Sequence, residues 1–172
     1  FCYRVTSFTA SNFQGRVKEI HNDRKLISKS RKLIKLIEKA YLDLDFRLAL
    51  SLILEMSSLG NQYFQKNEPW KLVKDNPEKC QRILATCLNI AKNLAVTIYP
   101  MLPDFSKRLS KQLNIEGPTW KDLGFELVHH KIKHAEPLVV KIEDHQLASV
   151  VEHKSDADVF PLDLKVGVVL SV

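Results

Sequence analysis

Apolar residues recur at helical spacing through about the first 115 residues, and this periodicity constrains the fold more than any other feature of the sequence. Between residues 26 and 44, for example, apolar side chains return every three, four and seven positions while lysines fill the opposite face. The 172 residues include only five glycines, which is few for a β-sandwich or a nucleotide-binding sheet. We therefore predict a mainly α protein in which residues 1–117 form an antiparallel bundle of about five helices.

Capping residues, prolines and glycines divide this region into helices. Asp23 and Asp45 precede apolar stretches as N-caps, and Asn76 precedes a proline in the same role. Gly15 is expected to end the first helix and Pro69 to close the third. The predicted helices cover about residues 1–13, 23–44, 45–68, 77–99 and 103–113. Three apolar residues around the junction of the second and third helices are assigned to buried stripes: Leu44, Phe46 and Leu50.

The sequence changes character after Gly117-Pro118. Residues 118–150 are predicted to form an extension with a helical turn at Trp120–Leu123 and a strand at 138–142, a stretch rich in β-branched residues. A polar linker follows over residues 151–161, and another β-branched stretch over residues 162–172 indicates a further strand. The expected architecture is therefore a helical bundle with a short β-containing C-terminal extension.

The positive charge is concentrated in one stretch of the chain. The formal net charge is +6, and residues 16–39 hold nine Lys and Arg against three acids, so this stretch accounts for the whole excess. A solvated face of an amphipathic helix is one explanation, and a polyanionic partner is the other. If the partner is RNA, Lys25, Lys29 and Lys32 are the predicted phosphate contacts, which would add salt-dependent and sequence-independent affinity.

The cysteines point to a reducing compartment. Cys2, Cys80 and Cys87 are odd in number and widely spaced, which argues against a disulfide framework. We find no signal peptide and no apolar run near eighteen residues, so we expect a cytoplasmic protein with no membrane partner. The sequence opens on Phe1 within an amphipathic pattern, from which we expect a fragment of a longer protein.

Three histidines lie close together near the end of the bundle, but they lack the pattern of a metal site. His129, His130 and His134 have no acid or cysteine at ligand spacing. We therefore predict no metal site and interpret these residues as part of a polar edge or turn.

A Pro-Trp pair just after a helix end gives the most informative candidate site. Pro69 fixes the backbone where the chain bends, so the indole of Trp70 could remain partly exposed. An exposed indole is a stacking platform for an unpaired base. The structural alternative is a core aromatic side chain that seals a corner of the bundle.

Several motifs together resemble one protein family. They are Asn61-x-Tyr63, Pro69-Trp70-Lys71-Leu72-x-Lys74, Tyr99-Pro100-Met101-Leu102-Pro103, Gly117-Pro118-Thr119-Trp120 and His129-His130-Lys131-Ile132. Upstream, Arg4 is followed at matching offsets by Phe8, Phe13 and Gly15. Over roughly residues 1 to 143, the chain resembles the anticodon-binding domain of methionyl-tRNA synthetases.

The resemblance implies how an anticodon would be recognised. In the family, the tryptophan that matches Trp70 stacks on the first anticodon base, a cytosine, and the arginine that matches Arg4 reads the base edge. Arginine donors suit the O2 and N3 acceptors of cytosine. The family's asparagine, four residues before the arginine, would lie one residue before Phe1. Pro69 matches the residue that orients the tryptophan. Asn61 and Tyr63 are also candidate anticodon-binding residues: they are expected to shape the helix end beneath Trp70, and the alternative is that either side chain faces the RNA.

The resemblance also implies which partners belong to the parent enzyme. That enzyme ligates methionine to initiator and elongator methionine tRNA, which carry a CAU anticodon, and uses ATP in a separate catalytic domain. This chain has no His-Ile-Gly-His signature and no Gly-rich loop, so we expect no catalytic residue and no cofactor site within it. The alternative function is a free-standing tRNA-binding or scaffold module without catalysis.

The end of the chain shows a second resemblance. Residues 160–172 are similar to the opening strand of the OB-type tRNA-binding domain that some methionyl-tRNA synthetases carry at the C-terminus. That domain also dimerises those enzymes, so the resemblance implies a possible homodimer of the parent. An ordinary terminal strand is the alternative.

Overall fold

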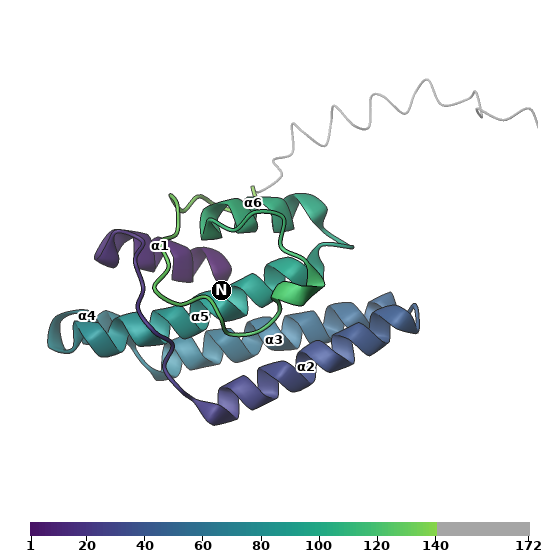
Figure 1. Cartoon of the computed structure of the whole chain (residues 1–172), viewed down its shortest axis with the longest axis horizontal. Helices are drawn as coiled ribbons and strands as arrows, with labels where there is room; N and C mark the ends of the chain where they lie inside the picture. Colours follow the sequence, from purple (N-terminus) through teal and green to yellow (C-terminus); the bar gives the residue numbers. More distant parts are fainter. Residues whose placement is uncertain (141–172) are drawn as a thin grey trace, which may run out of the picture. The chain divides into compact units, whose positions relative to one another are not determined.

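The computed structural model of the chain describes residues 1–140, of which Phe1–Leu138 form one compact unit (Figure 1). Its elements are α1 (Cys2–Phe13), α2 (Arg24–Leu42), α3 (Phe46–Lys66), α4 (Pro69–Asp75), α5 (Pro77–Ile98), α6 (Pro103–Leu113) and the 3₁₀ turn η1 (Trp120–Asp122). The prediction of a mainly α fold is confirmed. The structure adds a short sixth helix, because Pro69 begins α4 and does not simply close α3.

The helix α5 forms the centre of the bundle. Every residue from Ile83 to Ile98 is buried, and α1, α2, α3, α4 and α6 all pack against this helix. Figure 1 shows α2 and α3 along one side of α5 and α1 with α6 along the other. A helix that is enclosed on all sides must also bury its polar residues, which therefore need hydrogen-bond partners inside the protein.

The predicted N-caps are formed by side chains as expected. Asp23 accepts a hydrogen bond from the Leu26 N–H at 3.0 Å, and Asp45 accepts one from the Leu48 N–H at 2.9 Å. Asn76 accepts one from the Lys79 N–H at 3.0 Å. Caps of this kind contribute about 1 kcal/mol each to helix stability.

Three apolar residues that we assigned to buried stripes are exposed. Leu44, Phe46 and Leu50 are 72%, 53% and 39% exposed, so those assignments are wrong. The stripe of α3 that is buried contains Ala49 and Ile53, and Leu50 lies about 100° around the helix from Ala49. Leu44 lies in the turn between α2 and α3 and adopts a left-handed backbone conformation there (φ 58°).

The segment after α6 returns across the bundle and is fastened by side chains of α5. The Asn89 amide donates to the Leu127 carbonyl at 2.8 Å and accepts from the Leu127 N–H at 2.9 Å. The side-chain oxygen Oδ1 of Asn93 accepts from the Gly124 N–H at 2.9 Å. Two buried amides therefore supply the hydrogen bonds that a neighbouring strand would otherwise provide.

Gly15 permits the same segment to approach the end of α1. Its φ of +76° is left-handed, and an added Cβ would lie 2.7 Å from the Ile132 carbonyl oxygen. Arg16 and Lys131 form an isolated antiparallel bridge beside it.

The short turn η1 is closed by a capping box. The Asp122 carboxylate accepts from the Thr119 N–H at 2.6 Å and from the Thr119 hydroxyl at 2.9 Å. These hydrogen bonds, the backbone one first, lower the pKa of Asp122. The predicted helical turn at this position is confirmed.

The predicted strand at 138–142 is not formed over residues 138–140, since residues 138 and 139 form a bend and residue 140 has no regular secondary structure. Within residues 1–140 no strand is present beyond the Arg16–Lys131 bridge. The remainder of that prediction, the linker at 151–161 and the strand at 162–172 lie outside the described residues.

Candidate nucleic-acid interface

The backbone before α4 places Trp70 at the surface. Glu68 adopts a left-handed conformation (φ 43°), Pro69 occupies the first position of α4 and is buried, and Trp70 follows it with 44% of its surface exposed. The Cys80 thiol donates to the Pro69 carbonyl at 3.4 Å and ties this turn to α5. Trp70 therefore packs on the bundle with part of its indole and leaves the rest open to solvent.

Arg4 and Asn61 lie together although 57 residues separate them. The Arg4 Nη2 donates to the Asn61 Oδ1 at 2.6 Å, which joins α1 to α3. The guanidinium carbon of Arg4 also lies 4.8 Å from the centre of the Phe64 ring, within the range of a cation–π contact. These two contacts hold the exposed Arg4 side chain in one orientation.

Phe64 connects Arg4 with Trp70. Its ring centre lies 6.0 Å from that of Trp70, and Phe8 packs edge-on against it at 5.9 Å. Arg4, Phe64 and Trp70 therefore form a row. We name these three residues, together with Asn61, the Arg4–Trp70 site. Our sequence reasoning did not single out Phe64; its position beside the Asn61-x-Tyr63 motif was the available signal.

Tyr63 lies beneath the surface and supports the helix end. It is 6% exposed, and its hydroxyl group lies 3.1 Å from the Nδ1 of His21. Burial raises the pKa of the phenol above its usual value, so Tyr63 stays protonated. The structure therefore brings together Arg4, Asn61, Pro69 and Trp70, while Tyr63 points towards the loop before α2.

The start of α1 fits closely against α3 at Gly60. An added Cβ on Gly60 would lie 2.6 Å from the Phe1 ring, so only glycine leaves room for that ring. Gly60 immediately precedes Asn61, and Phe1 lies one helical turn before Arg4. This contact therefore sets the position of α1 close to the Arg4–Asn61 hydrogen bond.

The three cysteines are buried and act as packing residues. Burial raises the pKa of Cys2 and of Cys80 to about 11, and it raises the pKa of Cys87 as well. Thiols with such values are protonated at neutral pH and are poor nucleophiles. Cys80 and Cys87 both pack in the core of the bundle.

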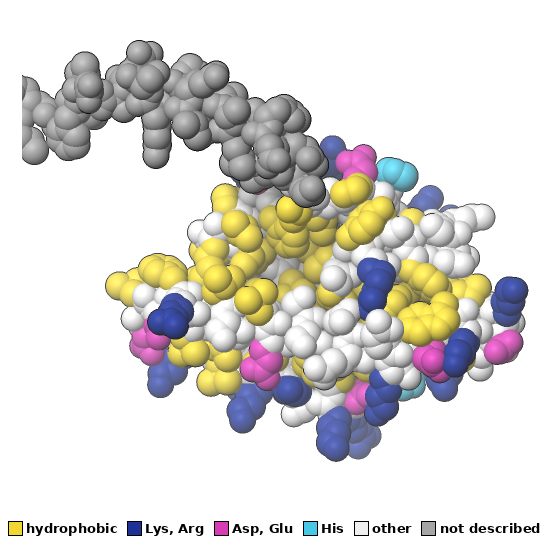
Figure 2. Space-filling model, turned by 180° about the vertical axis from the view of Figure 1, so that it is seen from behind, with side chains coloured by type: hydrophobic (Ala, Val, Ile, Leu, Met, Phe, Trp, Pro, Cys, Tyr) yellow, Lys and Arg dark blue, Asp and Glu magenta, His cyan; other side chains and the backbone are white. Residues whose placement is uncertain are grey.

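The lysines predicted to contact phosphate are all exposed on α2. Lys29 forms an ion pair with Glu55 of α3 at 3.4 Å, whereas no acid pairs with Lys25 or Lys32 among residues 1–140. Figure 2 shows Lys and Arg side chains along the lower edge of the molecule, where α2 lies. The contact of these lysines with RNA stays a prediction.

Two of the three histidines near the end of the bundle, His129 and His130, have protein partners. His130 is hydrogen-bonded through Nε2 to the Leu113 carbonyl, and His129 lies 3.6 Å from the Glu19 carboxylate. Across residues 1–140, no group of three or more His, Cys, Asp or Glu side chains could hold a metal ion. No helix in the same residues is long and apolar enough to cross a membrane.

The chain is similar to known proteins over most of its length. Residues 15–157 match the family described as the anticodon binding domain of methionyl tRNA ligase. The methionine–tRNA ligase of Methanobrevibacter smithii is 35% identical over 150 residues, which cover 84% of this chain and 23% of that protein. The enzyme of the same name from Archaeoglobus fulgidus is 30% identical over 189 residues, covering 99% of this chain and 29% of the relative.

A solved structure shows the same fold. The apo form of Mycobacterium tuberculosis methionyl-tRNA synthetase superposes with a TM-score of 0.72 at 20% identity, covering 82% of this chain and 31% of that one. With the family match over residues 15–157, the helical bundle is that of a tRNA-ligase anticodon-binding domain. The chain belongs to the family of methionyl-tRNA ligase anticodon-binding domains. It spans roughly a quarter of the length of the curated relatives that it matches.

Proposed function

We propose that the Arg4–Trp70 site binds the anticodon loop of methionine tRNA and reads the first base of CAU. The observation that carries the proposal is the row of Arg4, Phe64 and the half-exposed Trp70 beside Asn61. This site offers an aromatic face and a set of hydrogen-bond donors in a fixed orientation at one place on the surface. An unpaired base needs both of these for stacking and for recognition of its edge.

The two side chains have different roles in this proposal. Trp70 stacks on the cytosine and contributes affinity that depends little on which base is present. Arg4 donates to the cytosine O2 and N3, using donors other than the one that Asn61 accepts. Asn61 therefore acts as a positioning residue for Arg4, and Pro69 fixes the turn from which Trp70 projects.

The family membership supports a wider proposal about the parent protein. We propose that the chain functions within an ATP-dependent methionine–tRNA ligase in the cytoplasm, where a separate catalytic domain binds ATP and methionine. Initiator and elongator methionine tRNA are its partners. An OB-type domain beyond the described residues would allow the parent to form a homodimer.

Replacement of Trp70 tests the site directly. We expect Trp70→Ala to weaken binding to a CAU stem-loop by about 1–3 kcal/mol without changing the melting temperature markedly, because the indole is half exposed. Tyr99→Ala, which removes an aromatic side chain that is 51% exposed at the end of α5, is the matched control and should leave affinity unchanged. Equal effects of the two substitutions on affinity would refute the stacking role.

A further inference from the structure

A groove lies between the first half of α2 and the segment that returns across the bundle. It has a volume of about 660 Å³. On one side it is lined by Arg24, Ser28, Arg31 and Lys35 of α2, and on the other by Phe125 and Glu126. We name this feature the α2 groove.

The cations of the α2 groove form one stripe along the helix. Arg24, Ser28, Arg31 and Lys35 are spaced by four, three and four residues, which places them on the same face. From Arg24 to Lys35 this face extends for about 16 Å, at 1.5 Å per residue. Lys32, which borders the same groove, adds a fourth cation. The stripe is long enough to accompany several consecutive phosphates of one strand.

These cations have no counter-charge within the part of the chain that the structure describes. The ion pairs there use other basic residues, and Arg24, Arg31, Lys32 and Lys35 take part in none of them. Four like charges in one groove repel each other, and a bound polyanion would relieve that repulsion.

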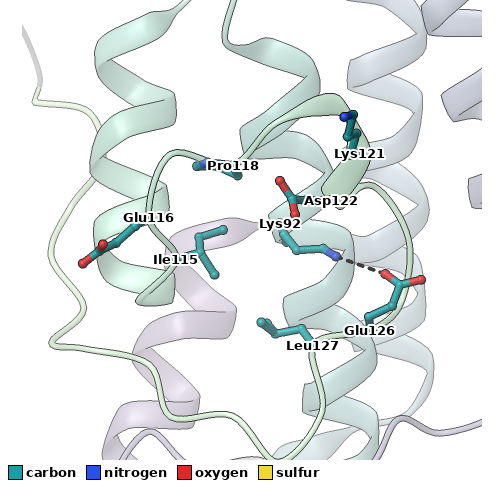
Figure 3. A pocket seen from close by; sticks show the side chains of 8 residues that line it. All are labelled: Lys92, Ile115, Glu116, Pro118, Lys121, Asp122, Glu126 and Leu127. Atoms are coloured by element: carbon teal, nitrogen blue, oxygen red, sulfur yellow. Dashed lines mark hydrogen bonds and ion pairs between the residues drawn. The ribbon is translucent and has the colours of Figure 1, made fainter.

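The one acid of the groove is already engaged. Glu126 accepts from the Lys92 ammonium at 3.4 Å, and only 6% of the Lys92 side chain is exposed (Figure 3). Figure 3 shows Lys92 reaching from α5 towards Glu126. Because Lys92 balances this carboxylate, the groove presents an excess of positive charge.

The remaining lining suits a sugar–phosphate backbone. Ile20, Ile27 and Phe125 give the groove apolar surface, against which ribose rings could pack. The Ser28 hydroxyl and the Asn22 amide are exposed donors of the kind that contact phosphate oxygens and 2′-hydroxyl groups.

The loop that opens the groove is also linked to the Arg4–Trp70 site. Asn22 follows His21, whose ring meets the Tyr63 hydroxyl at 3.1 Å. Tyr63 lies two residues beyond Asn61, the partner of Arg4. The loop at the start of the groove is therefore joined to α3 within two residues of the Arg4–Asn61 hydrogen bond.

We propose that the α2 groove binds the sugar–phosphate backbone of the anticodon stem while the loop is read at the Arg4–Trp70 site. This inference rests on the proposed function. The contact is blind to sequence, since it uses charges and hydroxyl donors on the backbone only. In this proposal the main phosphate contacts are Arg24, Arg31 and Lys35 in place of Lys25 and Lys29, because neither lysine lines the groove and Lys29 already pairs with Glu55.

The test compares two double variants of the full chain. Arg31→Ala/Lys35→Ala removes two cations from the groove, and Lys107→Ala/Arg108→Ala removes the same two residue types from the exposed face of α6. Each protein is titrated with a CAU stem-loop, and with the same stem-loop carrying another first anticodon base, at about 50 and about 200 mM salt.

The proposal predicts a change in salt dependence without a change in base discrimination. Loss of two phosphate contacts should reduce the magnitude of the negative slope of log affinity against log salt by about 1.5 to 2. The loss of affinity relative to the wild type should therefore be about tenfold larger at about 50 mM salt than at about 200 mM salt. The α6 variant should behave as the wild type. Both groove residues are exposed, so the melting temperature should not change.

Other outcomes would overturn the inference in distinguishable ways. An unchanged salt slope in the groove variant, with base discrimination intact in the wild type, would refute RNA binding by the α2 groove without contradicting the proposed function of the Arg4–Trp70 site. No discrimination in the wild type would refute the proposed function itself. Binding of the wild type to phosphatidylserine vesicles that depends on Arg31 and Lys35, with RNA affinity unaffected, would assign the groove to a membrane surface.

Discussion

Replacement of Asn89 by alanine should detach the returning segment from α5. The fully buried Asn89 amide makes hydrogen bonds to both backbone groups of Leu127, at 2.8 and 2.9 Å, and a third to the Ala85 carbonyl at 2.9 Å. Alanine would leave the Leu127 N–H and carbonyl without these partners. At about 1–1.5 kcal/mol for each hydrogen bond lost, the expected cost is about 2–4 kcal/mol.

Asn93 provides a matched control on the same helix. It makes one hydrogen bond to this segment, from the Gly124 N–H at 2.9 Å, and its own Nδ2 has no partner in the part of the chain that the structure describes. Its replacement by alanine removes one bond and also removes a buried donor that is unsatisfied. The expected cost is therefore smaller, about 1 kcal/mol.

Thermal and urea unfolding of the two variants would measure the difference. For a chain of this size, each kcal/mol corresponds to about 2–4 °C, so Asn89→Ala should lower the melting temperature by about 4–16 °C. Asn93→Ala should lower it by only a few degrees. Refutation would come from an Asn89→Ala melting temperature close to that of the wild type, or from a larger loss in Asn93→Ala.

Three further predictions concern the base-reading side chain, the thiols and the η1 turn. Arg4→Ala should relax discrimination among first anticodon bases more than it lowers overall affinity, as titration with stem-loops that differ only in that base would show; equal losses for all bases would contradict it. Burial raises the pKa of the Cys2 and Cys80 thiols to about 11 from 9.0, so the protonated thiols favour the folded state. The contribution of these thiols to the free energy of unfolding should therefore stay constant below pH 9 and decrease as pH rises from 9 to 11. Urea titrations should show a smaller decrease in Cys80→Ala than in the wild type. The pKa of Asp122 is lowered by its hydrogen bonds to Thr119, so its contribution is present above pH 4 and is lost as pH falls through the lowered pKa. Asp122→Asn should thus destabilise the chain at neutral pH and make little difference in strong acid; equal destabilisation at both would argue against this role.

Helix boundaries could be predicted from the sequence because local signals set them. The caps at Asp23, Asp45 and Asn76 act within three residues of themselves, and the structure shows each of them bonded as expected. The short α4 was missed because seven residues between two prolines are too few to show helical periodicity. The burial of Leu44 and Phe46 was predicted wrongly because periodicity does not say where a neighbouring helix stops covering a stripe.

The Arg4–Trp70 site could be predicted only in part. Arg4 and Trp70 were identified through a family resemblance, but no local pattern indicates that Arg4 meets Asn61 and Phe64, which lie more than fifty residues away. The role of Asn89 was equally hidden, because an asparagine within a helix normally points to solvent. Its burial follows from α5 being enclosed by the other helices, which is a property of the whole fold.

The central position of α5 also has a consequence for how the molecule opens. Since every other helix packs on α5, its amide protons should exchange with solvent only through global unfolding. The seven-residue α4, by contrast, packs chiefly on α5 and has only the Phe64–Trp70 contact between aromatic rings at its outer end. Its amides should exchange through local opening at a much lower free energy. Trp70 therefore lies on the part of the bundle that should open most readily towards an incoming base, whereas Arg4 lies on α1, a longer helix that packs on both α5 and α6.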